Sequence, residues 1–217
     1  MKRSVTPSER CKPAAGRLWL TLGISAFSLL VLLGGCTSDF SRGSKQVLRN
    51  LTVSANLLEN GDMTVSETWK VDLKDRGKAY RNLYRTFPLE SGKADGVTDL
   101  AVPDEDRKVS YSYAGDVDPE SVSGDEMEDR SYIHRSGSQL EIGWFMPAVD
   151  EGTRTFTVSY RIRNIIGVYA DTAVLYHAFV PQNFSLPVAS LNGTVRFPKA
   201  GSRNQVRAWL HTTARSH

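Results

Sequence analysis

Starting near Val47, apolar and polar residues alternate along the chain, so that every second side chain is apolar. The alternation is clearest at residues 51–57, 65–73, 109–113, 140–146 and 156–162, and weaker at 174–180, 195–197 and 206–210. This period is typical of β-strands with one face in a core and the other in water. No long segment shows the helical period. We therefore predict an all-β fold, an antiparallel β-sandwich of Ig-like or jelly-roll-like type, over residues 47–217.

The first two predicted strands form a hairpin whose register depends on the turn. A two-residue turn at Asn60-Gly61 would place an apolar residue opposite a polar one throughout, although cross-strand partners share a face. A three-residue loop at residues 60–62, or a bulge beside the turn, corrects this mismatch. The predicted pairs are then Leu51 with Val71, Val53 with Trp69, Ala55 with Glu67, and Leu57 with Val65.

Glu67 is the carboxylate that this register places on the apolar face, between Val65 and Trp69. Burying an ionised carboxylate without a partner costs several kcal/mol, so a cation or a donor must reach it, or its pKa rises. Arg81 and Arg85 are the nearest downstream candidates. Arginine suits a buried, bidentate contact with a carboxylate. We expect Glu67 to form a buried ion pair with one of these two arginines.

The residues before Cys36 have the organisation of a secretory signal. A basic stretch precedes the apolar run from Leu18 to Leu33, and Gly34-Gly35-Cys36 follows it. The small residues and the cysteine resemble the lipobox of bacterial lipoproteins, in which the cysteine is lipidated. We predict a lipoprotein signal peptide with a cleavable signal helix at residues 1–35, lipidation at Cys36, and a polar tether at 36–46. The alternative is an uncleaved signal anchor, although the apolar run is shorter than the ~20 residues that a spanning helix needs.

The leader also accounts for the basic charge of the chain. The whole sequence carries 27 basic and 24 acidic residues, for a net charge of +3. Five of the basic residues and one acid precede Cys36, which leaves 22 basic and 23 acidic residues in the remainder. We therefore expect no nucleic-acid partner. Cys11 and Cys36 are the two cysteines, so the processed domain has no thiol for a disulfide, a nucleophile or a metal.

An acidic segment runs from Asp116 to Asp129 and is rich in Gly and Ser. Its first acids have the spacing i, i+2, i+4, which could present oxygens to calcium. An EF-hand would require Gly and Glu where this chain has Ser121 and Met127. We interpret the segment as an exposed, solvated loop and leave calcium binding by it open. The four histidines show no zinc-site spacing, and we expect no metal and no cofactor.

Four short motifs occur in an order that resembles a known family. They are Asn60–Glu67, Tyr80–Leu89, Phe156–Ile162 and Tyr169–Tyr176. Together they are similar to the N-terminal extracytoplasmic domain of the bacterial predicted membrane proteins called DUF2207, over residues 47 to 211. The resemblance implies an envelope location and no established activity. Such proteins usually continue into a transmembrane helix, so either a lipid on Cys36 replaces the helix or the chain is a truncated relative.

Two functional interpretations follow. Glu67 and Asp171, which lies in the last motif, form the most enzyme-like pair, because two carboxylates in different environments can share acid and base roles in glycoside hydrolysis. Alternatively, Glu67 belongs to a structural ion pair and Asp171 caps a turn. We favour a lipid-anchored, non-catalytic binding or structural domain on the extracytoplasmic face of the bacterial membrane. Its partner would be the cell wall or an integral membrane protein, and an envelope glycan hydrolase is the alternative.

Overall fold

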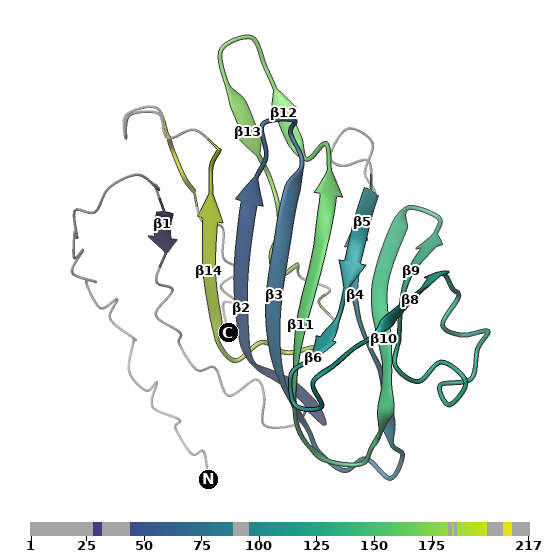
Figure 1. Cartoon of the computed structure of the whole chain (residues 1–217). Coiled ribbons are helices and arrows are strands. Elements are labelled where there is room, and N and C mark those ends of the chain that lie inside the picture. Colours follow the sequence, from purple (N-terminus) through teal and green to yellow (C-terminus); the bar gives the residue numbers. More distant parts are fainter. Residues whose placement is uncertain are drawn as a thin grey trace, which may run out of the picture.

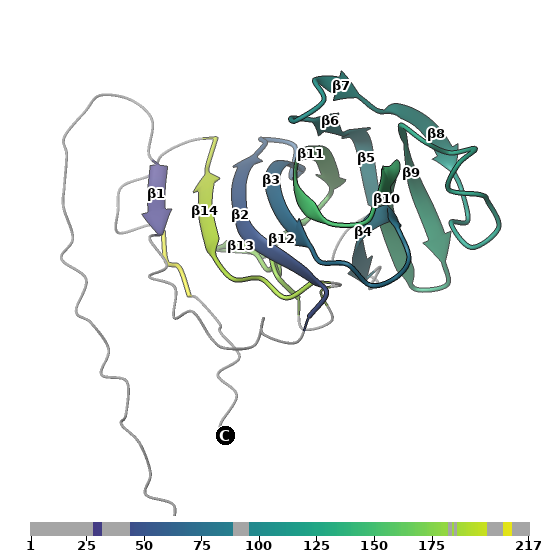
Figure 2. The same ribbon diagram turned by 90° about the horizontal axis from the view of Figure 1, so that it is seen from below.

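The computed structural model describes residues 28–31, 44–88, 96–181, 184, 186–198 and 206–209. All regular elements of these residues are β-strands, and they form two main sheets and one small hairpin (Figure 1). The prediction of an all-β sandwich is confirmed. Figure 2 views the molecule along the strands and shows the larger sheet running from β1 to β11. The smaller sheet lies at the β11 end of the larger sheet, away from β1.

The larger sheet has the strand order β1-β14-β2-β3-β11-β6-β7, and β5 pairs with β11 beside this path. Its strands are β1 (Ser28–Val31), β2 (Gln46–Leu57), β3 (Met63–Leu73), β5 (Gly96–Ala101), β6 (Pro103–Asp104), β7 (Val109–Ser110), β11 (Gly152–Arg163) and β14 (Leu191–Arg196). Most neighbours are antiparallel, as predicted. The pair of β14 with β2 is parallel, so the sheet is mixed.

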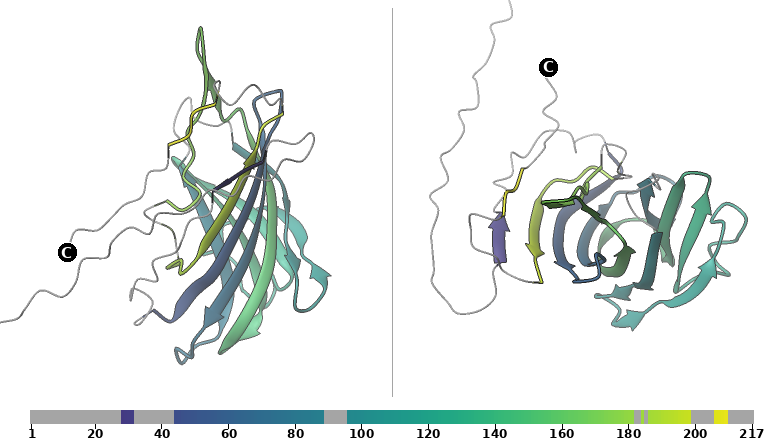
Figure 3. Two further views of the ribbon diagram at one scale, coloured as in Figure 1. Left: turned by 90° about the vertical axis from the view of Figure 1, so that its left-hand side faces the viewer. Right: turned by 90° about the horizontal axis from the view of Figure 1, so that it is seen from above.

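The smaller sheet has the order β4-β10-β9-β8. Its strands are β4 (Tyr80–Pro88), β8 (Ser112–Asp116), β9 (Arg130–Ser136) and β10 (Gln139–Val149). β8 pairs with β9 in parallel, and parallel neighbours need a connection that returns the chain to the same end of the sheet. The acidic segment after β8 provides this connection. A separate hairpin of β12 (Ile166–Val168) and β13 (Ala173–Leu175) projects beyond the end of the larger sheet (Figures 1 and 3).

The predicted register of the first hairpin is wrong by two residues. Val53, and not Ala55, lies opposite Glu67, and Leu57 pairs with Met63. The N–H of Leu58 donates to the carbonyl of Asp62 at 2.9 Å, so the three-residue loop is 59–61. Gly61, with a φ of 85°, takes the left-handed position at the end of that loop. A shift of two residues preserves the alternation, and Glu67 therefore still points into the core.

Most of the predicted leader, and Cys36 after it, lie outside the described residues. Its described part, Ser28–Val31, is strand β1, which pairs antiparallel with β14. The weak alternation at 174–180 produces a strand only at Ala173–Leu175, and the described residues Val206–Trp209 have no regular structure. Strands that the alternation did not indicate include β4, β5 and β9.

The core lies between the two sheets and is rich in aromatic rings. Trp69 of β3 contacts Trp144 of β10 edge-to-face, with ring centroids 5.2 Å apart. Trp144 in turn lies 5.5 Å from Phe156 of β11. The chain between β13 and β14 covers another part of the larger sheet, where Phe184 lies 5.4 Å from Trp69 and Leu186 is buried. The core thus has three walls, two of them sheets and the third this crossover segment.

Candidate functional site

Glu67 and Arg85 form an ion pair inside the sandwich. Glu67 comes from β3 of the larger sheet and Arg85 from β4 of the smaller one, and their side chains are 0% and 1% exposed. Arg85 Nη1 donates to Glu67 Oε1. Leu83, Arg85 and Phe87 are alternate residues of β4 and all three are buried, so the alternation of this strand directs the guanidinium into the core. The pair therefore connects the two sheets through a charge-assisted hydrogen bond.

Both oxygens of Glu67 have donors. The Tyr160 hydroxyl donates to Oε1 at 2.6 Å, and the Trp69 indole N–H donates to Oε2 at 2.8 Å. Burial raises the pKa of Tyr160 well above its ordinary value, so the phenol stays protonated and remains a donor. Burial alone would lower the pKa of Arg85, but the charge of Glu67 raises it. The Arg85 guanidinium therefore stays charged inside the core.

The crossover segment closes this site from the side. Arg85 Nη2 donates to the carbonyl of Ala178 at 3.3 Å, and the Phe184 ring lies 5.6 Å from the guanidinium carbon. His177 stacks edge-to-face on Phe179 at 4.8 Å. Arg85 Nε and His177 Nε2 are enclosed without a hydrogen-bond partner among the described residues. Burial, helped by the charge of Arg85, lowers the pKa of His177 to about 3, so this ring is neutral at pH 7.

Arg81, the other arginine named as a partner for Glu67, does not reach it. Its guanidinium contacts Asp125 in the acidic segment instead. The register of β10 against β4 is irregular between Phe145 and Val149, opposite the start of β4. Tyr80 takes the buried position there, and Arg81 is left partly exposed at the rim of the sheet. Arg85, and not Arg81, is therefore the partner of Glu67.

Asp171 lies far from this arrangement in the fold. It is exposed, in the turn of the β12–β13 hairpin, where the N–H of Tyr169 donates to the carbonyl of Thr172 at 2.8 Å. That hairpin projects into solvent, whereas Glu67 has no exposed surface (Figure 1). A substrate on the surface cannot contact both carboxylates. The structure therefore does not assemble the Glu67–Asp171 pair that a glycoside hydrolase would need.

The acidic segment from Asp116 to Asp129 is exposed, as expected, and its carboxylates have separate contacts. Asp129 pairs with Arg107 through both of its oxygens, Asp125 pairs with Arg81, and Asp116 Oδ1 lies 3.1 Å from His134 Nδ1. Within the part of the chain that the structure describes, no group of three His, Cys, Asp or Glu side chains is placed to hold a metal ion.

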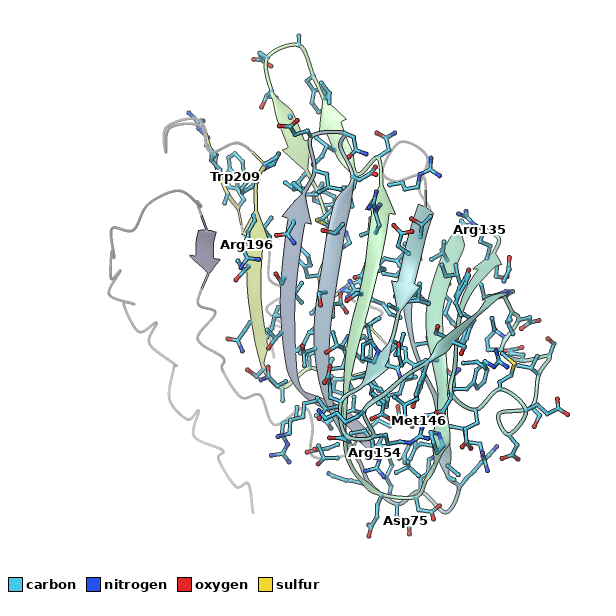
Figure 4. All side chains as sticks on the ribbon, in the orientation of Figure 1. Asp75, Arg135, Met146, Arg154, Arg196 and Trp209 are labelled. Atoms are coloured by element: carbon cyan, nitrogen blue, oxygen red, sulfur yellow. The ribbon has the colours of Figure 1, made fainter. Side chains whose placement is uncertain are left out.

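A hollow of about 270 Å³ lies at the end of the sandwich away from the hairpin, next to Met146 and Arg154 (Figure 4). Its charged lining is already engaged within the protein. Asp106 accepts the N–H of Thr155 at 2.7 Å, and Arg107 is held by Asp129. The hollow therefore offers few polar groups to a ligand.

The surface feature that the alternation did not predict is the apolar character of the β12–β13 hairpin. Its exposed large side chains, between 43% and 80% accessible, are Val168, Tyr169, Val174 and Tyr176. Isolated apolar residues are common on protein surfaces, whereas these four are grouped on, or directly next to, one projecting element. The alternation at residues 174–180 predicts that Val174 is buried, so it gives no sign of this exposed surface. The motif Tyr169–Tyr176 is the feature of the sequence that marks this segment.

Comparisons with known proteins give one family and no activity. No curated protein matches the chain. Among solved structures, a non-cellulosomal cohesin from the hyperthermophilic archaeon Archaeoglobus fulgidus aligns at 11% identity over 72% of this chain and 93% of that one, with a TM-score of 0.27. A likeness at that TM-score carries no inference. No helix of the described residues is long and apolar enough to cross a membrane. Residues 47–217 match the N-terminal domain of the predicted membrane proteins DUF2207, and the chain belongs to this family.

Proposed function

We propose that this chain is a lipid-anchored extracytoplasmic domain with a binding or structural role and no catalytic activity. The burial of Glu67 carries this proposal. Its carboxylate is the best catalytic candidate of the sequence, yet it has no exposed surface and contacts Arg85, Tyr160 and Trp69. A group that cannot meet a substrate cannot act as its acid or base. Glu67 serves instead to join the two sheets.

The anchor is the diacylated Cys36, followed by a polar tether that ends where β2 begins, at Gln46. Two acyl chains hold a protein firmly on a bilayer, whereas one chain binds only weakly. The family description as predicted membrane proteins supports a place at the membrane. The proposal adds that the contact is made by lipid, with the β-sandwich outside the cell membrane.

The contact surface for another envelope component is the β12–β13 hairpin. It carries exposed Tyr169 and Tyr176, and aromatic side chains are enriched where proteins contact partners. The partner is the cell wall or an integral membrane protein. Replacing Tyr169 and Val168 by Ser should release the domain from that partner without changing its melting temperature.

The anchor is tested by expressing the full chain in bacteria with a radiolabelled palmitate precursor. The wild-type chain and the matched control Cys11→Ser should be labelled, because Cys11 is removed with the leader. Cys36→Ser should carry no label. Equal labelling of Cys36→Ser would contradict the lipid anchor.

The non-catalytic role is tested by incubating the purified lipoprotein, held in detergent, with cell-wall sacculi. Sedimentation reports binding, and analysis of the supernatant for released sugars or peptides reports hydrolysis. The proposal expects no release above the buffer control. Release that disappears in Asp171→Asn or Glu67→Gln, while those variants remain folded, would restore the hydrolase interpretation.

A further inference from the structure

The side of β14 that faces away from β2 pairs with β1 in the full chain and lacks the usual protection of a strand edge. One side of β14 pairs with β2 over Leu191–Arg196 without a register shift, and β1 is the strand on its other side. Native edges are usually protected by proline, bulges or charged side chains. β14 contains no proline, and the guanidinium of its one charged residue, Arg196, donates back to Ser54 on β2 at 2.9 Å (Figure 4).

The backbone groups that face this edge can be assigned. The N–H of Leu51 donates to the carbonyl of Ser190 at 2.9 Å, so Ser190 faces β2. Because the N–H and C=O of successive strand residues point to opposite sides, the groups of Leu191, Gly193 and Val195 face away from β2. These groups are three donors and three acceptors in a row, which is a template for a further strand.

The edge already holds a strand in this structure. β1 pairs with β14 antiparallel, with Leu29 opposite Val195 and Val31 opposite Gly193. β1 belongs to residues 1–35, which the proposed function assigns to the removed leader. The inference that follows rests on that part of the proposed function, because processing at Cys36 would take β1 away and leave the edge open.

We propose that the processed domain self-associates through this edge, with β14 of one copy pairing antiparallel with β14 of a second copy. The sequence of β14 is self-complementary about Gly193. With Gly193 of one copy opposite Gly193 of the other, Leu191 lies opposite Val195 in both directions. The outward-facing backbone groups then pair with each other, and a two-fold axis passes between the two glycines.

The side chains of β14 fit this register. Leu191 and Val195 are partly buried against the core, so pairing them across the edge continues the apolar face from one copy into the next. Asn192 and Thr194 meet on the opposite, polar face. A Cβ built on Gly193 has no neighbouring atom within 4 Å, which leaves space on both sides of the two-fold axis.

The experiment uses a cysteine at the two-fold position. The full chain with Gly193→Cys is expressed in bacteria, and disulfide dimers are measured on non-reducing gels. Opposed residues in such a pair have Cα atoms about 5.5 Å apart, which suits a disulfide. Tyr113→Cys, at an exposed position of β8, is the matched control. The size of the reduced monomer reports whether the leader has been removed, and residues 37–217 behind an unrelated cleavable leader provide a second form that lacks β1 in every case.

The proposal expects at least about tenfold more dimer from Gly193→Cys than from Tyr113→Cys in every form that lacks β1, because position 193, unlike position 113, is held within disulfide distance of its copy. In sedimentation, the processed wild-type protein should be a dimer and the Gly193→Lys variant a monomer. The Gly193→Ala variant should remain a dimer. The proposal would be overturned if the leader is removed and the Gly193→Cys variant forms no disulfide dimer. It would also be overturned if this variant forms disulfides with a different protein and none with itself. If the native leader is retained, the anchor proposal fails, and the form with the unrelated leader still decides whether the edge pairs with itself.

Discussion

Two kinds of arginine–carboxylate pair occur in this domain. Arg85 and Glu67 lie inside the sandwich, and the carboxylate has two further donors in Tyr160 and Trp69. Arg81–Asp125 and Arg107–Asp129 lie at the surface around the acidic segment. The chemistry is the same, but water solvates the surface charges when a pair opens, whereas the buried charges would be left without a partner. Position in the fold, and not residue type, decides how much free energy is lost when one partner of a pair is removed.

The largest effect should come from Arg85→Met. This substitution keeps the apolar stem and leaves the charge of Glu67 buried with only neutral donors. Breaking a buried pair from one side costs about 3–5 kcal/mol. Urea unfolding should show that loss of free energy, and a loss below about 1 kcal/mol, the range of exposed pairs, would place Arg85–Glu67 with the surface pairs.

Tyr160→Phe should have the next largest effect. It removes the hydroxyl that donates to Glu67 Oε1 at 2.6 Å and keeps the ring that lies 5.3 Å from Phe87. Hydrogen bonds to a charged group contribute about 1.5–3 kcal/mol. Urea unfolding should detect a loss of about 2 kcal/mol. The matched control is Tyr113→Phe, an exposed tyrosine of β8, whose unfolding should match that of wild type.

His177 should make the domain lose stability in acid. Its pKa falls from an ordinary 6.5 to about 3 in the folded protein, mainly through burial and secondarily through Arg85. The unfolded chain therefore binds a proton that the folded protein does not, so the contribution is complete above pH 6.5 and is lost as the pH falls toward 3. Between pH 7 and pH 4.5 the free energy of unfolding should fall by about 1–2 kcal/mol more in wild type than in His177→Phe. Equal losses in the two proteins would contradict the buried, neutral imidazole.

The smallest effects should come from the surface pairs. Asp125→Asn and Asp129→Asn remove the partners of Arg81 and Arg107, and exposed ion pairs contribute about 0–1 kcal/mol. Each variant should unfold within about 0.5 kcal/mol of wild type, and the difference should vanish in 1 M salt. A salt-independent loss above about 2 kcal/mol in either variant would remove the distinction between the two kinds of pair.

Sequence reasoning found the position of Glu67 because a period of two is insensitive to a two-residue error in register. Val53 replaced Ala55 as its neighbour, yet the carboxylate stayed on the core face. The error came from the loop, where the left-handed residue had to be Gly61 at the last loop position. The choice between Arg85 and Arg81 depends on how β4 lies against β3 across the core, and no local pattern in the sequence encodes that placement.

The exposed apolar side chains of the β12–β13 hairpin could not be predicted from the alternation. Alternation shows which residues share a face, but it does not show whether anything packs against that face. The alternation predicts a buried side for Val174 and Tyr176. In the fold, β13 lies beyond the end of the larger sheet, and both side chains are exposed. Asp171 lies in the loop between β12 and β13, and its motif neighbours Tyr169 and Tyr176 are accessible.

A double-mutant cycle on Glu67→Gln and Arg85→Met, measured by urea unfolding, tests whether the two side chains act as one buried structural unit. If they do, each single variant leaves an unpaired group in the core, and the double variant should be no less stable than the worse single variant. The coupling free energy should then be about 2–3 kcal/mol. Additive losses, with a coupling below about 0.5 kcal/mol, would show that Glu67 and Arg85 do not hold the sheets together as a pair.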